Sequence, residues 1–286
     1  MPEVTALDGI LKGDQLRLIA AGLDHPESVC WSPDEDVLYA GGEAGQLYRV
    51  SLTGSVDTVA TIPNGFVLGL ALDGAGNLYV CDMGNKCVHR VTPDRKMSRY
   101  GPPIAVPNCP AFAHDGRLYV SDSGDWDGRN GGVLRIDPDG ASERLDIPPL
   151  AFANGTAIRE SHLYIVESQR PGVVRIHLDG GELEPVVTLD HCVPDGIAFD
   201  EHGGLWISCW QPNRIYRLAP NGELVTVVDD WTGEYVLSPT NTAFAGKNLD
   251  VLVLASLGGW GLKAISPGVR GAALERPYLS LTQSVG

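Results

Sequence analysis

A dipeptide of leucine followed by tyrosine, tryptophan or valine returns along the chain at nearly constant spacing. Its six copies begin 40, 40, 45, 42 and 47 residues apart, at Leu38-Tyr39, Leu78-Tyr79, Leu118-Tyr119, Leu163-Tyr164, Leu205-Trp206 and Leu252-Val253. A second pattern, apolar residue, any residue, arginine, apolar residue, recurs in the same order at residues 47–50, 88–91, 133–136, 173–176 and 215–218. A period of about 40–50 residues made of strands and turns is typical of propeller blades. Two series in phase therefore predict six copies of one β-unit.

Residues 193–228 show the order of strands within one unit. Strands are expected at residues 196–199, 205–208, 215–218 and 224–228. Residues 200–204 form a glycine-containing turn between the first two strands, and a Pro-Asn-Gly turn at residues 220–222 precedes the last. Each unit thus predicts a blade of four antiparallel strands. The fold class that follows is an all-β, six-bladed β-propeller.

The last unit lacks a fourth strand of its own. Its expected strands lie at residues 242–245, 251–255 and 261–265, whereas an apolar stretch at residues 15–20 precedes the first blade and belongs to none. An open sheet edge exposes unpaired backbone groups, and closure of the ring removes it. We therefore predict that residues 15–20 form the outer strand of the last blade. The whole chain, residues 1–286, is expected to be a single propeller domain.

Composition limits the classes of partner. The formal net charge is −15 at pH 7 and lysines and arginines are not clustered, so nucleic acid is excluded because its binding requires cations at the phosphates. No run of 18 apolar residues occurs, and the N-terminus has no basic region followed by an apolar one. We expect a cytoplasmic protein that acts on a small-molecule substrate and binds no membrane.

The cysteines form neither a CxxC pair nor a pattern with zinc-type spacing. They are Cys30, Cys81, Cys87, Cys109, Cys192 and Cys209. We expect them to be reduced and packed as small hydrophobic residues. Cys109 also raises the alternative of a nucleophile, for which His25 or His191 would be the base. The same two histidines flank the predicted channel mouth and are candidates for proton transfer.

Four polar side chains occupy matching places in four units. Asn108 and Asp195 each lie ten residues before the marker leucine of their unit, Asn154 lies nine before and Glu27 eleven before. Taken singly, such residues are often turn formers that bond to the backbone, but their matching places favour convergence on one point of the channel. Two carboxylates and two amide oxygens favour a hard cation, Ca²⁺, Mg²⁺ or Mn²⁺, over zinc.

Several of these segments resemble the SMP-30/gluconolactonase/LRE-like family. They are Glu27, Asn108, Asn154-Gly155 and residues 194–200, 204–208 and 239–244, and the resemblance covers residues 15–276. It implies a propeller lactonase with one divalent cation, calcium first, at a mouth of the channel. It also implies that Glu27, Asn154 and Asp195 bind the metal and that Asp195 is the general base. Asn108 would contact the substrate or complete the metal shell.

One position departs from the family pattern. Members often carry an arginine two residues before the asparagine that corresponds to Asn108, and Val106 stands there in this chain. Specificity for sugar lactones is therefore open. The predicted reaction is the opening of a lactone or related cyclic ester, with a metal-polarised carbonyl and a water activated by Asp195.

Other functions remain compatible with the same scaffold, because a fold does not determine a function. They are a phosphotriesterase-like hydrolase, a strictosidine-synthase-like enzyme and a propeller that binds without catalysis. A long connection at residues 121–132 contains Asp122, Asp125, Trp126 and Asp127. It either covers the channel and contacts substrate, or is a solvated insertion.

Overall fold

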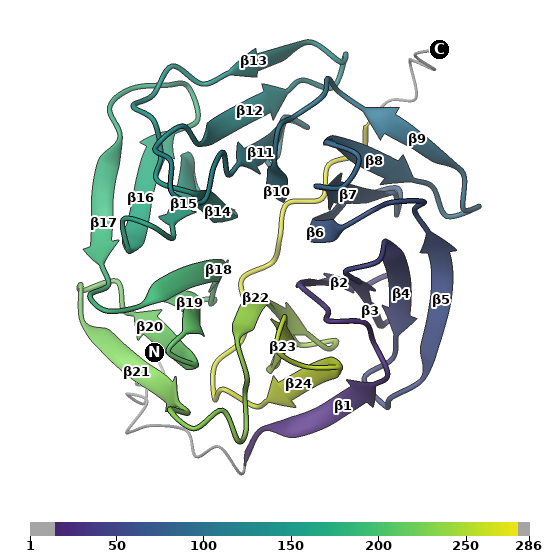
Figure 1. The fold of residues 1–286 in the computed structure, drawn as a ribbon, viewed down its shortest axis with the longest axis vertical. Coiled ribbons are helices and arrows are strands. Elements are labelled where there is room, and N and C mark those ends of the chain that lie inside the picture. The colour runs from purple at the N-terminus through teal and green to yellow at the C-terminus, as the bar shows by residue number, and fades with distance from the viewer. Residues whose placement is uncertain (1–14, 280–286) are drawn as a thin grey trace.

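The computed structural model describes residues 15–279, which form a ring of six antiparallel sheets around a central axis (Figure 1). Each sheet contains four strands that follow one another from the axis outward. The prediction of an all-β, six-bladed β-propeller is confirmed. Within the described residues, no helix is long and apolar enough to cross a membrane.

The strands are assigned to blades in chain order. Blade 1 contains β2 (Ser28–Ser32), β3 (Val37–Gly41), β4 (Gln46–Val50) and β5 (Val56–Thr61). Blade 2 contains β6 (Val67–Leu72), β7 (Leu78–Asp82), β8 (Cys87–Val91) and β9 (Met97–Tyr100). Blade 3 contains β10 (Pro107–Phe112), β11 (Leu118–Asp122), β12 (Gly132–Ile136) and β13 (Ser142–Arg144). Blade 4 contains β14 (Ala153–Arg159), β15 (His162–Glu167), β16 (Gly172–His177) and β17 (Glu184–Thr188). Blade 5 contains β18 (Val193–Phe199), β19 (Leu205–Gln211), β20 (Arg214–Leu218) and β21 (Leu224–Asp229). Blade 6 contains β22 (Pro239–Ala245), β23 (Val251–Ser256), β24 (Gly261–Ile265) and β1 (Arg17–Ala21).

Blade 6 is closed by a strand from the beginning of the chain. β1 runs antiparallel to β24, with Arg17 opposite Ala264 and Ala21 opposite Gly261. In Figure 1 this purple strand lies beside the yellow-green β24. The prediction that residues 15–20 supply the missing outer strand is confirmed, with a shift of one to two residues in its bounds. Two distant parts of the chain thus share one sheet, which removes the exposed edge of β24.

The core consists of apolar clusters that lie between neighbouring blades. One cluster joins blade 1 to blade 6 through residues such as Leu38 and Ala245, and another joins blades 4 and 5 through Val166 and Ile207. The marker leucines belong to these clusters and are buried, at 0 to 4% exposure. Because each blade must bury the same two faces against its neighbours, the apolar pattern repeats once per blade. This packing explains the period seen in the sequence.

One end of the ring carries the turns between the first two strands of each blade. In blade 5 this turn is stabilised by Asp200, whose carboxylate accepts hydrogen bonds from the backbone of Gly204 at 2.8 Å and from the Trp206 indole at 3.0 Å. Gly203 has a φ of +84°, a conformation that favours glycine. The turn predicted at residues 200–204 is confirmed.

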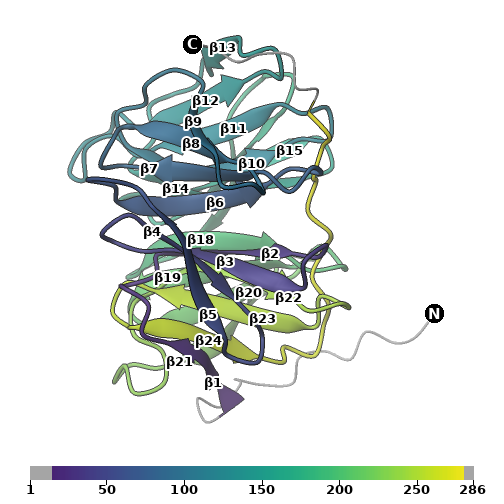
Figure 2. The same ribbon diagram turned by 90° about the vertical axis from the view of Figure 1, so that its right-hand side faces the viewer.

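The C-terminal segment crosses this same end of the ring. After β24 it contacts the blade 5 turn, where Glu201 donates to the carbonyl of Arg270 at 2.9 Å. It then reaches blade 2, where Gly74 donates to Pro277 at 2.9 Å. Figure 2 shows this yellow segment running along one face of the molecule, past the ends of the sheets. The opposite end of the ring, where the innermost strands begin, carries the candidate site.

Candidate functional site

The four polar residues occupy one position of the repeat. In blade 5, Phe199 pairs with the marker leucine, Leu205, and Asp195 lies four residues before Phe199. The same count from the partner of each marker leucine gives Glu27, Leu68, Asn108, Asn154 and Thr240 in the other blades. The offsets of nine to eleven residues seen in the sequence therefore come from turn length alone, and the structural positions are equivalent.

A β-bulge lies at this position in blades 2 to 6. In blade 3, Pro107 pairs with Asp122 and Pro110 pairs with Val120, so Asn108 and Cys109 together face a single residue, Ser121. A bulge redirects a side chain and is common beside functional sites. The strand expected at residues 196–199 begins after Asp195, but Asn108, Asn154 and Asp195 all lie inside strands. The first two strands of these blades also pair on the N-terminal side of the bulge, and the apolar pattern of the sequence does not reveal this pairing.

Each of the four predicted residues is buried and presents an oxygen without a hydrogen-bond partner among the described residues. Their side chains belong to residues that are only 2 to 6% exposed, and the atoms are Glu27 Oε2, Asn108 Oδ1, Asn154 Oδ1 and Asp195 Oδ1. Buried polar atoms are nearly always paired, because an unmade hydrogen bond is costly. Four unpaired oxygens at one position of the repeat fit a cation, which accepts only electron-pair donors. The donor set suits Ca²⁺, Mg²⁺ or Mn²⁺.

Two serines orient the asparagine amides. The amide nitrogen of Asn108 donates to Ser123 Oγ at 3.0 Å, and that of Asn154 donates to Ser168 Oγ at 3.1 Å. Each serine hydroxyl donates in turn to a backbone carbonyl of the next blade at 2.7 Å. Since a serine hydroxyl that already donates to a carbonyl must accept from the amide, the amide oxygen is the free atom. The role of these serines was not predicted from the sequence, although each serine directly follows an acidic residue that ends the second strand of its blade.

The two carboxylates are held in an environment that opposes their charge. Burial raises the pKa of Asp195 to about 7, and the amide of Asn154 lowers it in part. Burial also raises the pKa of Glu27 well above its ordinary value, and the negative charges of Asp195 and Glu43 add to this effect. The charge of Asp195, in β18 of blade 5, thus reaches Glu27, which directly precedes β2 of blade 1. A bound cation would relieve both penalties.

The other predicted proton donors and nucleophiles lie in less suitable settings. His191 is exposed, whereas His25 packs on the Trp260 ring at 4.2 Å and lies 3.2 Å from carboxylate oxygens of both Asp24 and Glu43. Cys109 is buried and burial raises its pKa, which keeps the thiol protonated. The six cysteines are free and buried, as expected.

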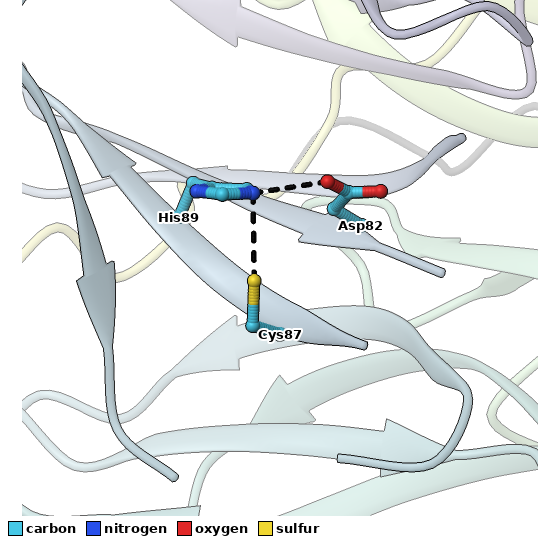
Figure 3. Close-up of side chains that lie close together, drawn as sticks. All are labelled: Asp82, Cys87 and His89. Atoms are coloured by element: carbon cyan, nitrogen blue, oxygen red, sulfur yellow. Dashed lines mark hydrogen bonds and ion pairs between the residues drawn. The ribbon is translucent and has the colours of Figure 1, made fainter. Parts of the chain in front are cut away.

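A second group of potential metal ligands lies in blade 2 (Figure 3). His89 Nε2 is 2.9 Å from Asp82 Oδ2 and 3.4 Å from Cys87 Sγ. Burial lowers the pKa of His89, but the hydrogen bonds to Asp82 and Cys87 outweigh it and raise the pKa to about 9. His89 is therefore a cation that pairs with the Asp82 carboxylate. Arginines pair with the equivalent carboxylates of the next two blades: Arg144 pairs with Asp122, and Arg170 pairs with Glu167. The ion pairs favour a structural role for this group.

The sequence matches the family described as the SMP-30/gluconolactonase/LRE-like region over residues 5–124 and 113–258. This chain belongs to the SMP-30/gluconolactonase/LRE-like family. One relative is the L-arabinolactonase of Azospirillum brasilense, which is 28% identical over 251 residues that cover 81% of each chain. The strictosidine synthase-like protein 6 of Arabidopsis thaliana is 26% identical over 65% of this chain and 56% of that one.

Solved structures share the propeller of this family member. A gluconolactonase from Xanthomonas campestris superposes with a TM-score of 0.73 at 20% identity, covering 90% of this chain and 89% of that one. A regucalcin from Agrobacterium tumefaciens, described as a calcium-binding protein, has a TM-score of 0.74 at 14% identity over 91% and 95% of the two chains. At these identities the likeness shows the fold alone.

Proposed function

We propose that this chain is a hydrolase that depends on a divalent cation and opens the ring of a lactone. The observation that carries the proposal is the set of four buried oxygens without partners, contributed by four different blades. The similarity to an L-arabinolactonase over most of both chains supports the reaction class.

Glu27, Asn154 and Asp195 would hold the cation. Two carboxylate charges and a doubly charged ion give a nearly neutral site. The attraction between them offsets the free-energy cost of removing both acids from water. Oxygen ligands suit calcium, magnesium or manganese, and the calcium-binding regucalcin of the same fold favours calcium among them. A bound divalent cation supplies positive charge that polarises an ester carbonyl and stabilises negative charge as it develops.

Asp195 would move the proton. Its carboxylate accepts a proton from the attacking water while the water oxygen bonds to the lactone carbonyl carbon. The ring C–O bond then breaks, and the leaving alkoxide takes the proton from Asp195 to give a hydroxy acid. Asn108, held by Ser123, would orient the substrate or complete the ligand set.

Chelation tests the proposal. Removal of divalent ions should abolish hydrolysis and lower the midpoint of thermal unfolding, because the cation binds only the folded state. Adding back calcium, magnesium and manganese separately should show which ion restores the rate. Full activity after exhaustive chelation would refute metal dependence.

A substrate panel separates the reaction classes. Lactones, a linear aryl ester and a phosphotriester should be compared under one set of conditions by following acid release in a pH-stat. We expect turnover of lactones to exceed that of the other two substrates. Turnover of the phosphotriester alone would assign this site to phosphotriester hydrolysis instead.

A further inference from the structure

Three aromatic rings from three blades meet at the end of the ring that carries the candidate site. Trp126, from the connection at residues 123–131 of blade 3, contacts Phe152 of blade 4 with ring centroids 4.6 Å apart. It also contacts Trp210 of blade 5 at 6.2 Å, and both contacts are edge to face. Trp126 remains 44% exposed. We refer to Trp126, Phe152 and Trp210 as the aromatic cluster.

The aromatic cluster adjoins three of the four candidate site residues. Phe152 lies two residues before Asn154 in the chain. Trp210 follows Cys209, which pairs with Pro194, the neighbour of Asp195. The connection that carries Trp126 begins at Ser123, which accepts the hydrogen bond of the Asn108 amide. A molecule held by the site oxygens of blades 3, 4 and 5 would therefore lie next to these rings.

Hydrogen bonds fold the connection at residues 123–131 towards blade 4. The backbone of Asp125 donates to Asn130 Oδ1 at 2.9 Å, and Asn130 Nδ2 donates to Asp125 Oδ2 at 3.0 Å. Arg144 binds the carbonyl of Asn130 at 3.1 Å, and Gly131 pairs with Leu150 of the blade 4 side. The connection is thus built to present Trp126 over the next blades, which favours the covering role over a solvated insertion.

Apolar side chains continue around the same side of the mouth. The residue two positions before the site position is half-buried and apolar in blades 2 to 5, being Phe66, Val106, Phe152 and Val193. The corresponding residues of blades 6 and 1 are Ser238 and His25. The mouth therefore has apolar side chains beside Asn108 and Asn154, whereas beside Glu27 the imidazole of His25 packs on the exposed ring of Trp260.

We infer that the aromatic cluster binds an apolar substituent of the substrate, so that the substrates are lactones with an aryl or alkyl group rather than polyhydroxylated sugar lactones. This inference rests on the proposed function. An exposed aromatic surface beside a reactive centre gains binding free energy when an apolar group covers it. A sugar hydroxyl placed against the same rings would lose its hydrogen bonds to water without replacement.

Equilibrium binding of lactams tests the inference without turnover, since an amide ring has the shape of a lactone and resists hydrolysis. Calorimetry should compare γ-phenyl-γ-butyrolactam with γ-butyrolactam. We expect the phenyl compound to bind at least about 10-fold more tightly, Trp126→Ala to remove that preference and Trp126→Phe to keep most of it. Trp231→Ala is the matched control, because Trp231 is a 76% exposed tryptophan outside the cluster, and it should keep the preference.

Rates of hydrolysis add an independent comparison. The kcat/KM ratio of γ-phenyl-γ-butyrolactone to D-glucono-δ-lactone should be high in the wild type and should fall roughly 10-fold in Trp126→Ala. A phenyl preference that survives Trp126→Ala, or that Trp231→Ala removes equally, overturns the inference, as does a lack of preference in the wild type. Preference in lactam binding without hydrolysis of any lactone would refute only the proposed function.

Discussion

Asp195→Asn is expected to stabilise the metal-free protein, although it removes a proposed ligand and base. Burial raises the pKa of Asp195 to about 7 from an ordinary 3.8. An acid whose pKa is raised in the folded state binds more protons folded than unfolded. Its contribution therefore lowers the free energy of unfolding progressively as pH rises from about 4 to about 7, and the full penalty persists above pH 7. Asparagine has nearly the same volume and carries no charge to desolvate.

The difference between a pKa of about 7 and one of 3.8 corresponds to about 4 kcal/mol at alkaline pH. For a chain of 286 residues, that free energy raises the unfolding midpoint by roughly 7 °C. At pH 4 the wild type and the variant should unfold at nearly the same temperature, because Asp195 is then protonated in the fold. The pH dependence, and not only the size of the difference, identifies the buried charge as the cause.

Calorimetry in chelator at pH 4, 6 and 8 would measure this effect, and a calcium titration of the same samples would measure the opposite one. Asp195→Asn should bind calcium more weakly and stay inactive at saturating calcium, because proton transfer contributes about 10²–10⁴-fold. Asn154→Asp is the matched control, since it adds a buried charge and should lower metal-free stability while tightening calcium binding. If Asp195→Asn is no more stable than the wild type at pH 8 in chelator, the buried charge of Asp195 does not destabilise the metal-free protein. If it regains the wild-type rate with calcium, Asp195 is a ligand only.

Three further perturbations have defined outcomes. Ser168→Ala should weaken calcium binding several-fold by calorimetry, because Asn154 loses the acceptor that fixes its amide, and unchanged affinity would remove the serine from the site. Deletion of residues 1–21 should give insoluble protein by exposing β24; a soluble, folded ring would show that closure lies elsewhere. His89→Ala should cost about 1–3 kcal/mol more at pH 6 than at pH 10, because the stability from a raised histidine pKa of about 9 is complete below about 6.5 and is lost as pH rises through 9. His89→Arg should retain the stability of the ion pair with Asp82, measured by chemical denaturation. Stabilisation of the wild type by zinc would contradict the structural role.

The sequence predicted those features that depend on burial between blades. The marker leucines repeat because each packs in a cluster between two sheets, and the unpaired stretch before blade 1 was visible as a strand without a blade. The equivalence of the site positions in all blades was not visible in the sequence. In blade 6 this position holds Thr240, and the number of residues between it and the marker leucine, Leu252, differs because the turn length differs. The aromatic cluster was hidden too, since Trp126 meets residues 26 and 84 positions later in the chain. Only the folded ring brings such distant positions together.

A chain of hydroxyl groups links successive blades at the level of the site. Ser123 donates to the carbonyl of Ala153 and Ser168 to that of Pro194, each at 2.7 Å. Further round the ring, Ser208 donates to the carbonyl of Thr240, and the Thr240 hydroxyl donates to that of Glu27 at 2.7 Å.

These bonds fix neighbouring innermost strands at the height where each contributes one oxygen. A metal site whose ligands come from separate blades loses its geometry if the blades shift, because effective charge stabilisation requires donors held in place before the substrate arrives. The two serines that bind the asparagine amides therefore join the orientation of these amides to the spacing of the blades. The hydroxyl chain thus ties together the blades whose site oxygens have no hydrogen-bond partner among the described residues.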